Sequence, residues 1–251
     1  MRIRAGGLPA IALRRPLSRG RVVTMKGLFL FLSLVFLASA TRGADTYDII
    51  RDFSATENPG GAWSYGWKEN LRGEFYALRF NRTQFDEFGT SWHIWEYQTY
   101  GVQPAFIYFP PTNTATVTSE GGVGRYPPGT LVITTGHEST HLNFAVLRFT
   151  AQKTGVYRVA TAVRSHLDGP PSGDTDFHVL LNGHPVFTRF LDPVSQASFS
   201  RLIHLSAGDT VDFAMGRGRD GVEFGSALKI KAVINRRART EFPWNHFRPV
   251  Q

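Results

Sequence analysis

The chain has 251 residues, contains no cysteine and carries a formal net charge of +8 at pH 7. The lack of cysteine excludes thiol catalysis and cysteine-ligated zinc sites, and a domain of this length must be held together by its core. Residues 1–44 hold eight of the 28 basic residues and no acidic residue, so residues 45–251 carry 20 of each kind, a balance that argues against nucleic-acid binding.

The N-terminal segment has the layout of a secretory signal peptide. From Met25, one lysine precedes an apolar run, Leu28–Leu37, and small residues follow up to Ala40. The run is too short for a membrane-spanning helix, which needs about 20 residues. We therefore predict that residues 1–44 are a signal peptide and that the protein is secreted, extracellular or periplasmic. Met25 is then the true start, and residues 1–24 are a long n-region or a misassigned start; a transit peptide is the alternative.

Residues 45–234 are predicted to form a single all-β domain. Short apolar and β-branched runs alternate with turns rich in Gly, Pro, Asn and Asp, and no long stretch has a helical stripe. Asn182-Gly183 lies between two such runs, which is the strongest short-range signal for a hairpin. The pattern favours a two-sheet antiparallel β-sandwich of the jelly-roll kind. The predicted strands are Tyr47–Phe53, Ala62–Trp67, Glu74–Phe80, Ser91–Tyr97, Ala105–Phe109, Ala115–Thr118, Thr130–Thr135, Asn143–Thr150, Val156–Val163, Asp176–Leu181, His184–Phe190, Ala197–Leu205, Thr210–Met215 and Leu228–Ile234.

Two segments lie outside this strand pattern. Thr112–Tyr126 is polar and glycine-rich, so we expect a long loop or a weak edge strand there. Residues 235–251 form a basic, proline-containing tail, which is either disordered or packs Phe242 and Trp244 against the body of the domain.

Several stretches share a recurring strand-and-turn pattern. They are PPGTLVITTG (127–136), FAVLRFTAQKTGVYRVATAV (144–163), DTDFHVLLNGHPVF (174–187) and LSAGDTVDFAMGRG (205–218), preceded by DFSATENPGGAWSYGW (52–67). Together they resemble a β-sandwich module of secreted bacterial proteins, many of them of the PEP-CTERM type, and carbohydrate-binding jelly rolls of the galactose-binding-like type. The resemblance implies the fold and a carbohydrate ligand, and it implies no reaction. The tail lacks the Pro-Glu-Pro box and the closing apolar segment of the sorted members.

The aromatic-rich front portion supplies candidate ligand-binding residues. Trp63, Tyr65 and Trp67 alternate and therefore share one face of a strand, whereas Trp92 and Trp95 fall on opposite faces. An exposed ring can stack on the apolar face of a sugar, but aromatic rings are also the largest core residues. The candidate ligand-binding residues are Trp63, Trp67, Trp92, Trp95 and Tyr97.

The stretch His137-Glu138-Ser139-Thr140-His141 spells H-E-x-x-H, the zinc signature of many metalloproteases. On a helix, residues four apart lie one above the other and both imidazoles reach one ion. In an extended strand they stand about 13 Å apart, too far for a shared ligand. Because a β-rich run ending in Gly136 precedes the motif, we predict a polar loop between two strands, and a zinc-dependent hydrolase is the alternative.

A structural Ca²⁺ site is a further prediction. Asp168, Asp174 and Asp176 surround a Gly-Pro loop, and jelly-roll binding modules often hold Ca²⁺ through loop carboxylates and carbonyls. Their spacing is not that of an EF-hand, and turn-forming aspartates are the other interpretation.

From these patterns we predict a secreted, non-catalytic β-sandwich that binds a polysaccharide or another envelope component. No cofactor is expected apart from the possible Ca²⁺, and no nucleic acid or membrane span is expected for the mature chain. The alternatives are a zinc-dependent hydrolase that uses residues 137–141 and a purely structural or adhesive envelope protein.

Overall fold

The computed structural model describes residues 45–97, 104–119, 123–135, 143–168, 173–222 and 225–237. These ranges contain only strands, turns and irregular connections, which confirms the all-β class, and no helix in them is long and apolar enough to span a membrane. The strands are β1 (Asp45–Asp48), β2 (Trp63–Lys68), β3 (Tyr76–Ala77), β4 (Phe80–Phe85), β5 (Ser91–Glu96), β6 (Ala105–Phe109), β7 (Val117–Ser119), β8 (Gly124–Tyr126), β9 (Thr130–Thr134), β10 (Phe144–Thr150), β11 (Gly155–Ser165), β12 (Thr175–Leu181), β13 (His184–Leu191), β14 (Gln196–Leu205), β15 (Thr210–Gly216) and β16 (Ala227–Arg236).

The strands from β9 to β16 form a jelly roll. One sheet, here sheet A, contains the order β14-β11-β16-β9, and the other, sheet B, contains the order β13-β12-β15-β10. The chain changes sheet at every step except from β12 to β13, and neighbouring strands are antiparallel. This alternation between two sheets is the jelly-roll arrangement. The predicted two-sheet antiparallel β-sandwich is therefore confirmed.

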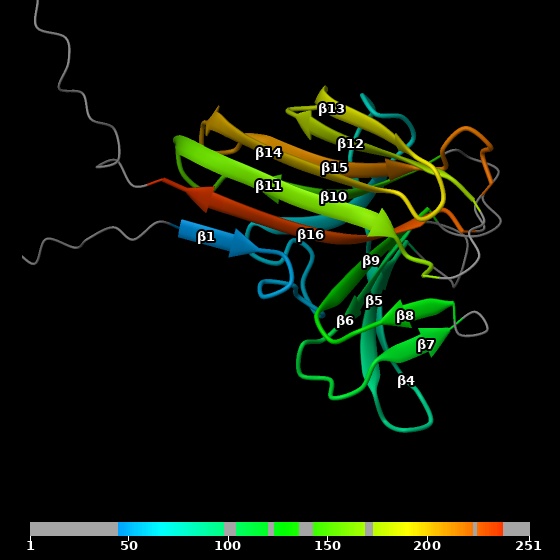
Figure 1. Cartoon of the computed structure of the whole chain (residues 1–251). Coiled ribbons are helices and arrows are strands. Elements are labelled where there is room, and N and C mark those ends of the chain that lie inside the picture. The colour runs from blue at the N-terminus through cyan, green and yellow to red at the C-terminus, as the bar shows by residue number, and fades with distance from the viewer. Residues whose placement is uncertain are drawn as a thin grey trace, which may run out of the picture. The chain divides into compact units, whose positions relative to one another are not determined.

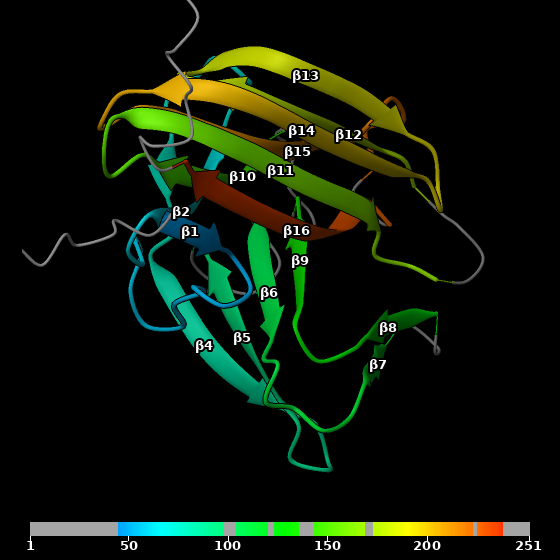
Figure 2. The ribbon, with the colours of Figure 1, turned by 60° about the vertical axis from the view of Figure 1, so that its left-hand side comes forward.

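The strands before β9 enlarge both sheets. β2 and β3 extend sheet B beyond β10, while β6, β5 and β4 extend sheet A beyond β9. Two strands pair with the same edge of β16, one after the other. β9 pairs with its first part, Ala227–Ile230, and β1 pairs with its last part, Val233–Arg236. In Figures 1 and 2, β9, β6, β5 and β4 run steeply away from β11 and β14, with the β7–β8 hairpin beside them.

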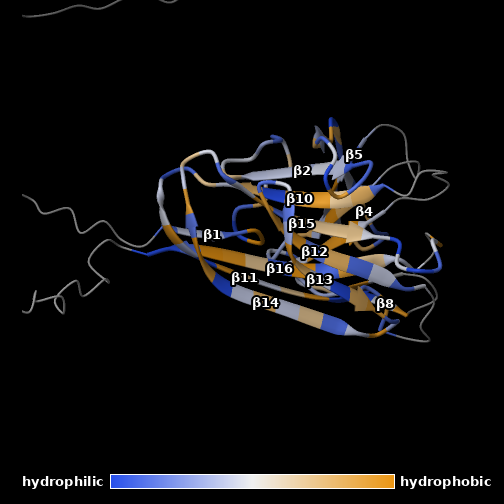
Figure 3. Ribbon diagram, turned by 90° about the horizontal axis from the view of Figure 1, so that it is seen from above, coloured by the Kyte–Doolittle hydropathy of each residue, from blue (hydrophilic) through white to orange (hydrophobic). Residues whose placement is uncertain are grey.

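The core lies between the two sheets because successive side chains on a strand point to opposite faces. On β11, Tyr157, Val159 and Val163 point inward and are buried, while Ala162 is exposed on the outer face. The inward side chains of sheets A and B meet in one large cluster that runs from Ile49 to Ile234. Figure 3 shows the apolar residues concentrated on β10 and β15, while β14 is mostly hydrophilic or intermediate.

The outer face of sheet A is covered only in part. The β7–β8 hairpin lies over the front strands, where the Tyr126 ring stacks on Phe109 at a centroid distance of 4.7 Å and Val117 joins the same cluster. Over β14, β11 and β16 the outward side chains of Ser198, Ala162 and Lys231 are exposed, whereas Lys229 is only 6% exposed. The open part of this face is where the candidate site lies.

Part of the outer face of sheet B is covered by the segment 69–75, which packs Leu71 and Phe75 on the sheet and encloses charged groups. The Lys68 ammonium lies 2.8 Å from the Asp212 carboxylate, and both side chains are almost completely buried. Arg148 binds the same carboxylate with two hydrogen bonds of 2.7 and 2.9 Å, and its guanidinium lies 4.1 Å from the centre of the Phe75 ring. One carboxylate thus pairs with two cations beneath this cover.

Three predicted segments differ in the structure. The strand predicted over Tyr47–Phe53 ends at Asp48, because the Asp52 carboxylate accepts a hydrogen bond from the Asp48 amide at 2.8 Å and the chain turns. The strand predicted over Glu74–Phe80 is divided into the end of the cover over sheet B, the short β3 and the start of β4. Thr112–Tyr126 contains the β7–β8 hairpin.

The predicted hairpin at Asn182-Gly183 is confirmed. These two residues join β12 to β13 with positive φ angles of 48° and 79°. Positive φ at both central positions is the geometry of a type I′ turn, which Asn-Gly adopts more readily than other pairs.

Candidate functional site

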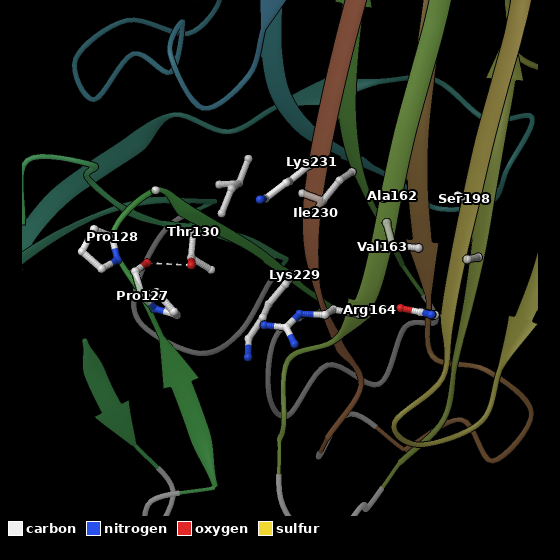
Figure 4. A pocket seen from close by; sticks show the side chains of 14 residues that line it. Pro127, Pro128, Thr130, Ala162, Val163, Arg164, Ser198, Lys229, Ile230 and Lys231 are labelled. Atoms are coloured by element: carbon white, nitrogen blue, oxygen red, sulfur yellow. Dashed lines mark hydrogen bonds between the residues drawn. The ribbon is translucent and has the colours of Figure 1, made fainter. Parts of the chain in front are cut away.

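A groove of about 660 Å³ lies on the open part of the outer face of sheet A. Its floor is formed by β11, β14 and β16, and one wall is the segment 127–131 that leads from β8 into β9 (Figure 4). The volume is within the range of about 300–1,000 Å³ that is usual for ligand sites. The lining residues are Pro127, Pro128, Gly129, Thr130, Leu131, Ala162, Val163, Arg164, Gln196, Ala197, Ser198, Lys229, Ile230 and Lys231.

Strand register explains the shape of the groove. Ala162 on the central strand β11 lies between Ser198 on β14 and Lys231 on β16. Alanine and serine are short, so this row leaves a hollow on the sheet surface. The segment that contains Pro127 and Pro128 stands beside the hollow and closes one side.

The polar groups of the groove are mainly cations. Arg164 and Lys229 occupy directly opposite positions on β11 and β16, and both contact Asp168, which lies just outside the groove. The Lys229 ammonium is 2.6 Å and the Arg164 guanidinium 3.4 Å from that carboxylate. Lys231 is exposed and forms no ion pair within the described ranges. None of the described residues that line the groove is acidic.

The pKa values of three groups near Arg164, those of Asp168, Lys229 and His166, are shifted by their surroundings. Burial raises the pKa of Asp168, but the hydrogen bond from Lys229 and the charges of Lys229 and Arg164 outweigh it, so the pKa is lowered. Burial lowers the pKa of Lys229, and the bond to Asp168 opposes that change. His166 is buried nearby, and desolvation, reinforced by Lys229, lowers its pKa to about 4. At neutral pH the groove is therefore cationic, with a neutral imidazole beneath it.

Two of the predicted ligand-binding residues lie in the core, which corrects the prediction for them. Trp63 has no exposed surface, and Trp95 is 3% exposed. The Trp63 ring contacts Phe149 at 5.4 Å between centroids, and the Trp95 indole donates a hydrogen bond of 2.8 Å to the Ser54 carbonyl. Both residues point inward from their strands, so neither ring can stack on a ligand at the surface.

The other three predicted aromatic residues are half-buried. Trp92 faces the opposite side of β5 from Trp95, as expected, and its indole donates a hydrogen bond of 2.9 Å to Gln84 while its ring contacts Phe109. Trp67 stacks on Tyr76 at 4.7 Å and meets Tyr97 edge-on at 5.6 Å. The structure therefore brings Trp67 of sheet B and Tyr97, which follows β5 of sheet A, together in an aromatic cluster that packs against the main core, outside the groove.

The three aspartates predicted to bind Ca²⁺ have different partners in the structure. Asp168 binds Lys229 and Arg164 beside the groove. Asp174 accepts hydrogen bonds from the backbone amides of residues 219 and 220, and Asp176 accepts one from the amide of Gly218 and contacts His178. No cluster of three or more potential metal ligands occurs among the described residues. The alternative interpretation, turn-forming aspartates, fits Asp174 and Asp176.

The H-E-x-x-H stretch, residues 137–141, lies outside the described residues. The chain leaves β9 at Thr134 before it and enters β10 at Phe144 after it. The predicted position between two strands agrees with these boundaries, while the conformation of the motif stays a prediction.

Sequence reasoning missed the cations of the groove. A signal for them was present, because Lys229 and Lys231 flank the buried Ile230 and must point to the same outer face. Their proximity to Arg164 depends on the pairing of β11 with β16, whose residues are 65 positions apart at this point, and no local pattern reveals that pairing.

Comparison with known proteins leaves the family of the chain open. No protein family matches the sequence, and no curated protein matches it. Among solved structures, a CBM51 from Clostridium perfringens GH95 in complex with methyl-galactose aligns with 63% of this chain and 94% of its own length, at 13% identity and a TM-score of 0.34.

Other solved structures align over shorter stretches. A Podospora anserina GH26-CBM35 β-(1,4)-mannanase aligns at 19% identity and a TM-score of 0.33, over 55% of this chain and 28% of its own. Pika GITRL aligns at 17% identity and a TM-score of 0.26, over 37% of this chain and 72% of its own. These TM-scores lie below 0.5, so the likenesses support no inference about function.

Proposed function

We propose that this protein is a secreted, non-catalytic module that binds carbohydrate in the groove on the outer face of sheet A. The proposal joins two independent features of the chain. Residues 25–40 have the order of a secretory signal, which supports a location outside the cytoplasm, where polysaccharides and envelope glycans are accessible. The groove supplies the binding site.

The observation that carries the proposal is the hollow over β11, β14 and β16. An exposed row of short side chains, Ala162 and Ser198, lies next to a raised wall and a set of hydrogen-bond donors. The C–H faces of a sugar can pack on Ala162 and the Pro127 ring, while its hydroxyl groups bind Gln196, Ser198 and the cations. A few polar groups around apolar contacts are typical of ligand sites.

The chemistry of the groove favours binding over hydrolysis. Glycosidases need two carboxyl groups on opposite sides of the scissile bond, separated by about 5–10 Å. The described lining residues carry amines, a guanidinium, hydroxyls and an amide, but no carboxyl group. This composition of the lining supports the proposed role as a binding module for a polysaccharide or another envelope glycan.

The experiment is a glycan array and a polysaccharide pull-down with the full chain and two matched variants. Ala162→Trp fills the groove from an exposed position, so binding should fall at least tenfold while the fold is retained. Ala207→Trp places the same ring on an exposed turn at the other end of β14 and should bind like the wild type. No binding by the wild type would refute the proposed function, and equal binding by Ala162→Trp would refute the groove as its site.

A Trp67→Ala variant tests the aromatic cluster in the same assay. Trp67 and Tyr97 were predicted as ligand-binding residues; Trp67 is on β2 of sheet B and Tyr97 directly follows β5 of sheet A, and neither lines the groove. Binding that is lost in Trp67→Ala but unchanged in Ala162→Trp would move the proposed site to that cluster. Thermal unfolding of each variant separates lost binding from lost folding.

A further inference from the structure

We infer that the groove selects an anionic carbohydrate, a polymer whose sugar units carry carboxylate or sulfate groups; this inference rests on the proposed function. Three side chains carry it: Arg164 and Lys231, which are exposed, and Lys229, whose side chain is only 6% exposed and which contributes through its charge. They come from two neighbouring strands, and all three line the same groove. Arginine and lysine are the side chains that bind carboxylate and sulfate or phosphate oxygens through charge-assisted hydrogen bonds.

The cations are placed at a cost to the fold. Arg164 and Lys229 are directly opposite on paired strands, an arrangement in which like charges destabilise a sheet. Asp168 offsets part of this repulsion through its contacts of 2.6 Å with Lys229 and 3.4 Å with Arg164. One carboxylate serves two cations, so the pair keeps an excess positive charge that an anionic ligand would neutralise.

Lys231 supplies a third charge that the described residues do not balance. Its side chain is exposed and has no ion pair within the described ranges. Figure 4 shows it extending from β16 toward the wall that holds Pro128 and Thr130, while the charged ends of Arg164 and Lys229 lie close together further along the groove. The Lys231 ammonium is therefore available to a ligand that lies between the strand and the wall.

The spacing of the cations suits a chain of sugars. Side chains that point outward recur about every 6.6 Å along a strand. Lys231 is the next outward residue of β16 after Lys229, so their Cα atoms are about 6.6 Å apart. Along the same outer row of β11, beyond the groove, Ala160 is followed by the exposed Arg158, about 20 Å from Arg164. A single sugar cannot reach both ends of this row, whereas a charged polymer that lies along β11 can.

Nucleic acid is the other common polyanion, and the groove lacks its usual contacts. Sites for single-stranded nucleic acid combine cations with aromatic rings on which the bases stack. No aromatic side chain is among the described residues that line the groove. The alanine and proline surfaces instead offer flat apolar contact of the size of a sugar face.

The test measures the affinity of the full chain for polygalacturonate, dextran sulfate, unsubstituted dextran and single-stranded DNA, at about 0.05 M and about 0.5 M salt. Two variants are compared with the wild type. Lys231→Gln removes the unpaired ammonium and should weaken binding of the acidic polysaccharide about tenfold. Arg72→Gln removes an exposed cation from the cover over sheet B and should change binding less than twofold. Unchanged thermal unfolding shows that both variants fold.

Each outcome has one meaning. Preference for an acidic polysaccharide over dextran, weakened by salt and by Lys231→Gln, supports the inference, and the better of the two acidic polymers identifies carboxylate or sulfate as the recognised group. Equal binding of dextran and acidic polymers overturns the anionic preference but leaves the proposed function in place. No binding of any polysaccharide overturns both. Binding of DNA as tight as that of polygalacturonate, or loss of affinity in both variants alike, shows general attraction to polyanions and overturns the inference.

Discussion

At the scale of single residues, His166 shows how the site constrains a titratable group. The imidazole is buried beside the groove, contacts the Tyr126 hydroxyl at 3.1 Å and lies near the Lys229 ammonium. Removal from water, with help from that positive charge, favours the neutral ring and lowers the pKa of His166 to about 4. In the unfolded chain the pKa returns to about 6.5.

This difference predicts acid destabilisation. Between pH 6.5 and pH 4 the unfolded chain binds a proton at His166 that the folded protein does not, so stability is lost as the pH falls through this window. The loss amounts to roughly 3 kcal/mol when the window has been crossed. Urea unfolding at several pH values should show it, and His166→Asn, which cannot titrate, should have a shallower pH dependence. An identical pH profile in the variant would contradict this account of His166.

A second residue-scale prediction concerns the buried charges on sheet B. Asp212 is the only acidic partner shown for both Lys68 and Arg148 in the described ranges. Asp212→Asn leaves two cations without a counter-charge, and we expect a loss of about 3–5 kcal/mol in the free energy of unfolding. Lys68→Met should cost less, because Arg148 still balances Asp212.

Urea denaturation measures these changes, with the exposed Glu69→Gln as the control for a charge change at the surface. The control should stay within about 0.5 kcal/mol of the wild type. If Asp212→Asn is as stable as Glu69→Gln, the ion pairs do not hold this face of the sheet together.

At the scale of elements, the turn after β15 is held by two carboxylates from the start of β12 and the segment before it. Asp176 accepts a hydrogen bond of 2.7 Å from the Gly218 amide, and Asp174 accepts one of 3.0 Å from the amide of Arg219. Gly218 has a φ of +70°, and a Cβ added there would lie 1.8 Å from the Asp174 carboxylate. The turn therefore needs glycine for both its conformation and its close approach.

We expect Gly218→Ala to destabilise the protein by about 2–3 kcal/mol, since backbone strain and a clash act together. The matched control is Gly89→Ala, which has a φ of +81° but no atom within 4 Å of the added Cβ, and which should cost about 1 kcal/mol. Equilibrium unfolding in urea gives both values. If the two variants lose the same stability, the contact with Asp174 has no part in the effect.

Local patterns predicted most of the strands because burial on one face imposes an alternation that the sequence displays. Ala105–Phe109 was predicted with its observed bounds, and Asn182-Gly183 located its hairpin. The alternation does not predict β4. This edge strand, Phe80–Phe85, is largely exposed and has no row of buried apolar side chains. In the β7–β8 hairpin the alternation predicted only a strand over Ala115–Thr118, which overlaps β7, and missed β8, because Val117 and Tyr126 are buried by the packing of the hairpin over sheet A.

At the scale of the whole molecule, the candidate site depends on pairings that are distant in sequence. The floor of the groove joins β11, β14 and β16, and its wall comes from the residues that precede β9. Aromatic content pointed instead to Trp63 and Trp95, which the sandwich needs for its core. A large ring is as useful to a core as to a ligand site, and only the crossovers of the chain decide which role it has.

The shared core also predicts how the molecule unfolds. Trp63 and Tyr65 come from the front strands, yet they pack in one cluster with Phe149 and Phe213 of the jelly roll. β10 pairs with β2 on one side and β15 on the other, so the front strands cannot separate without exposing the centre of sheet B. We therefore expect tryptophan fluorescence, which reports mainly on the front strands because they hold four of the five tryptophans, and far-ultraviolet circular dichroism, which reports on all strands, to change at the same urea concentration. Two separated transitions would show that the front strands form a core of their own, and the contacts of Trp63 with Phe149 and Phe213 would then contribute little to stability.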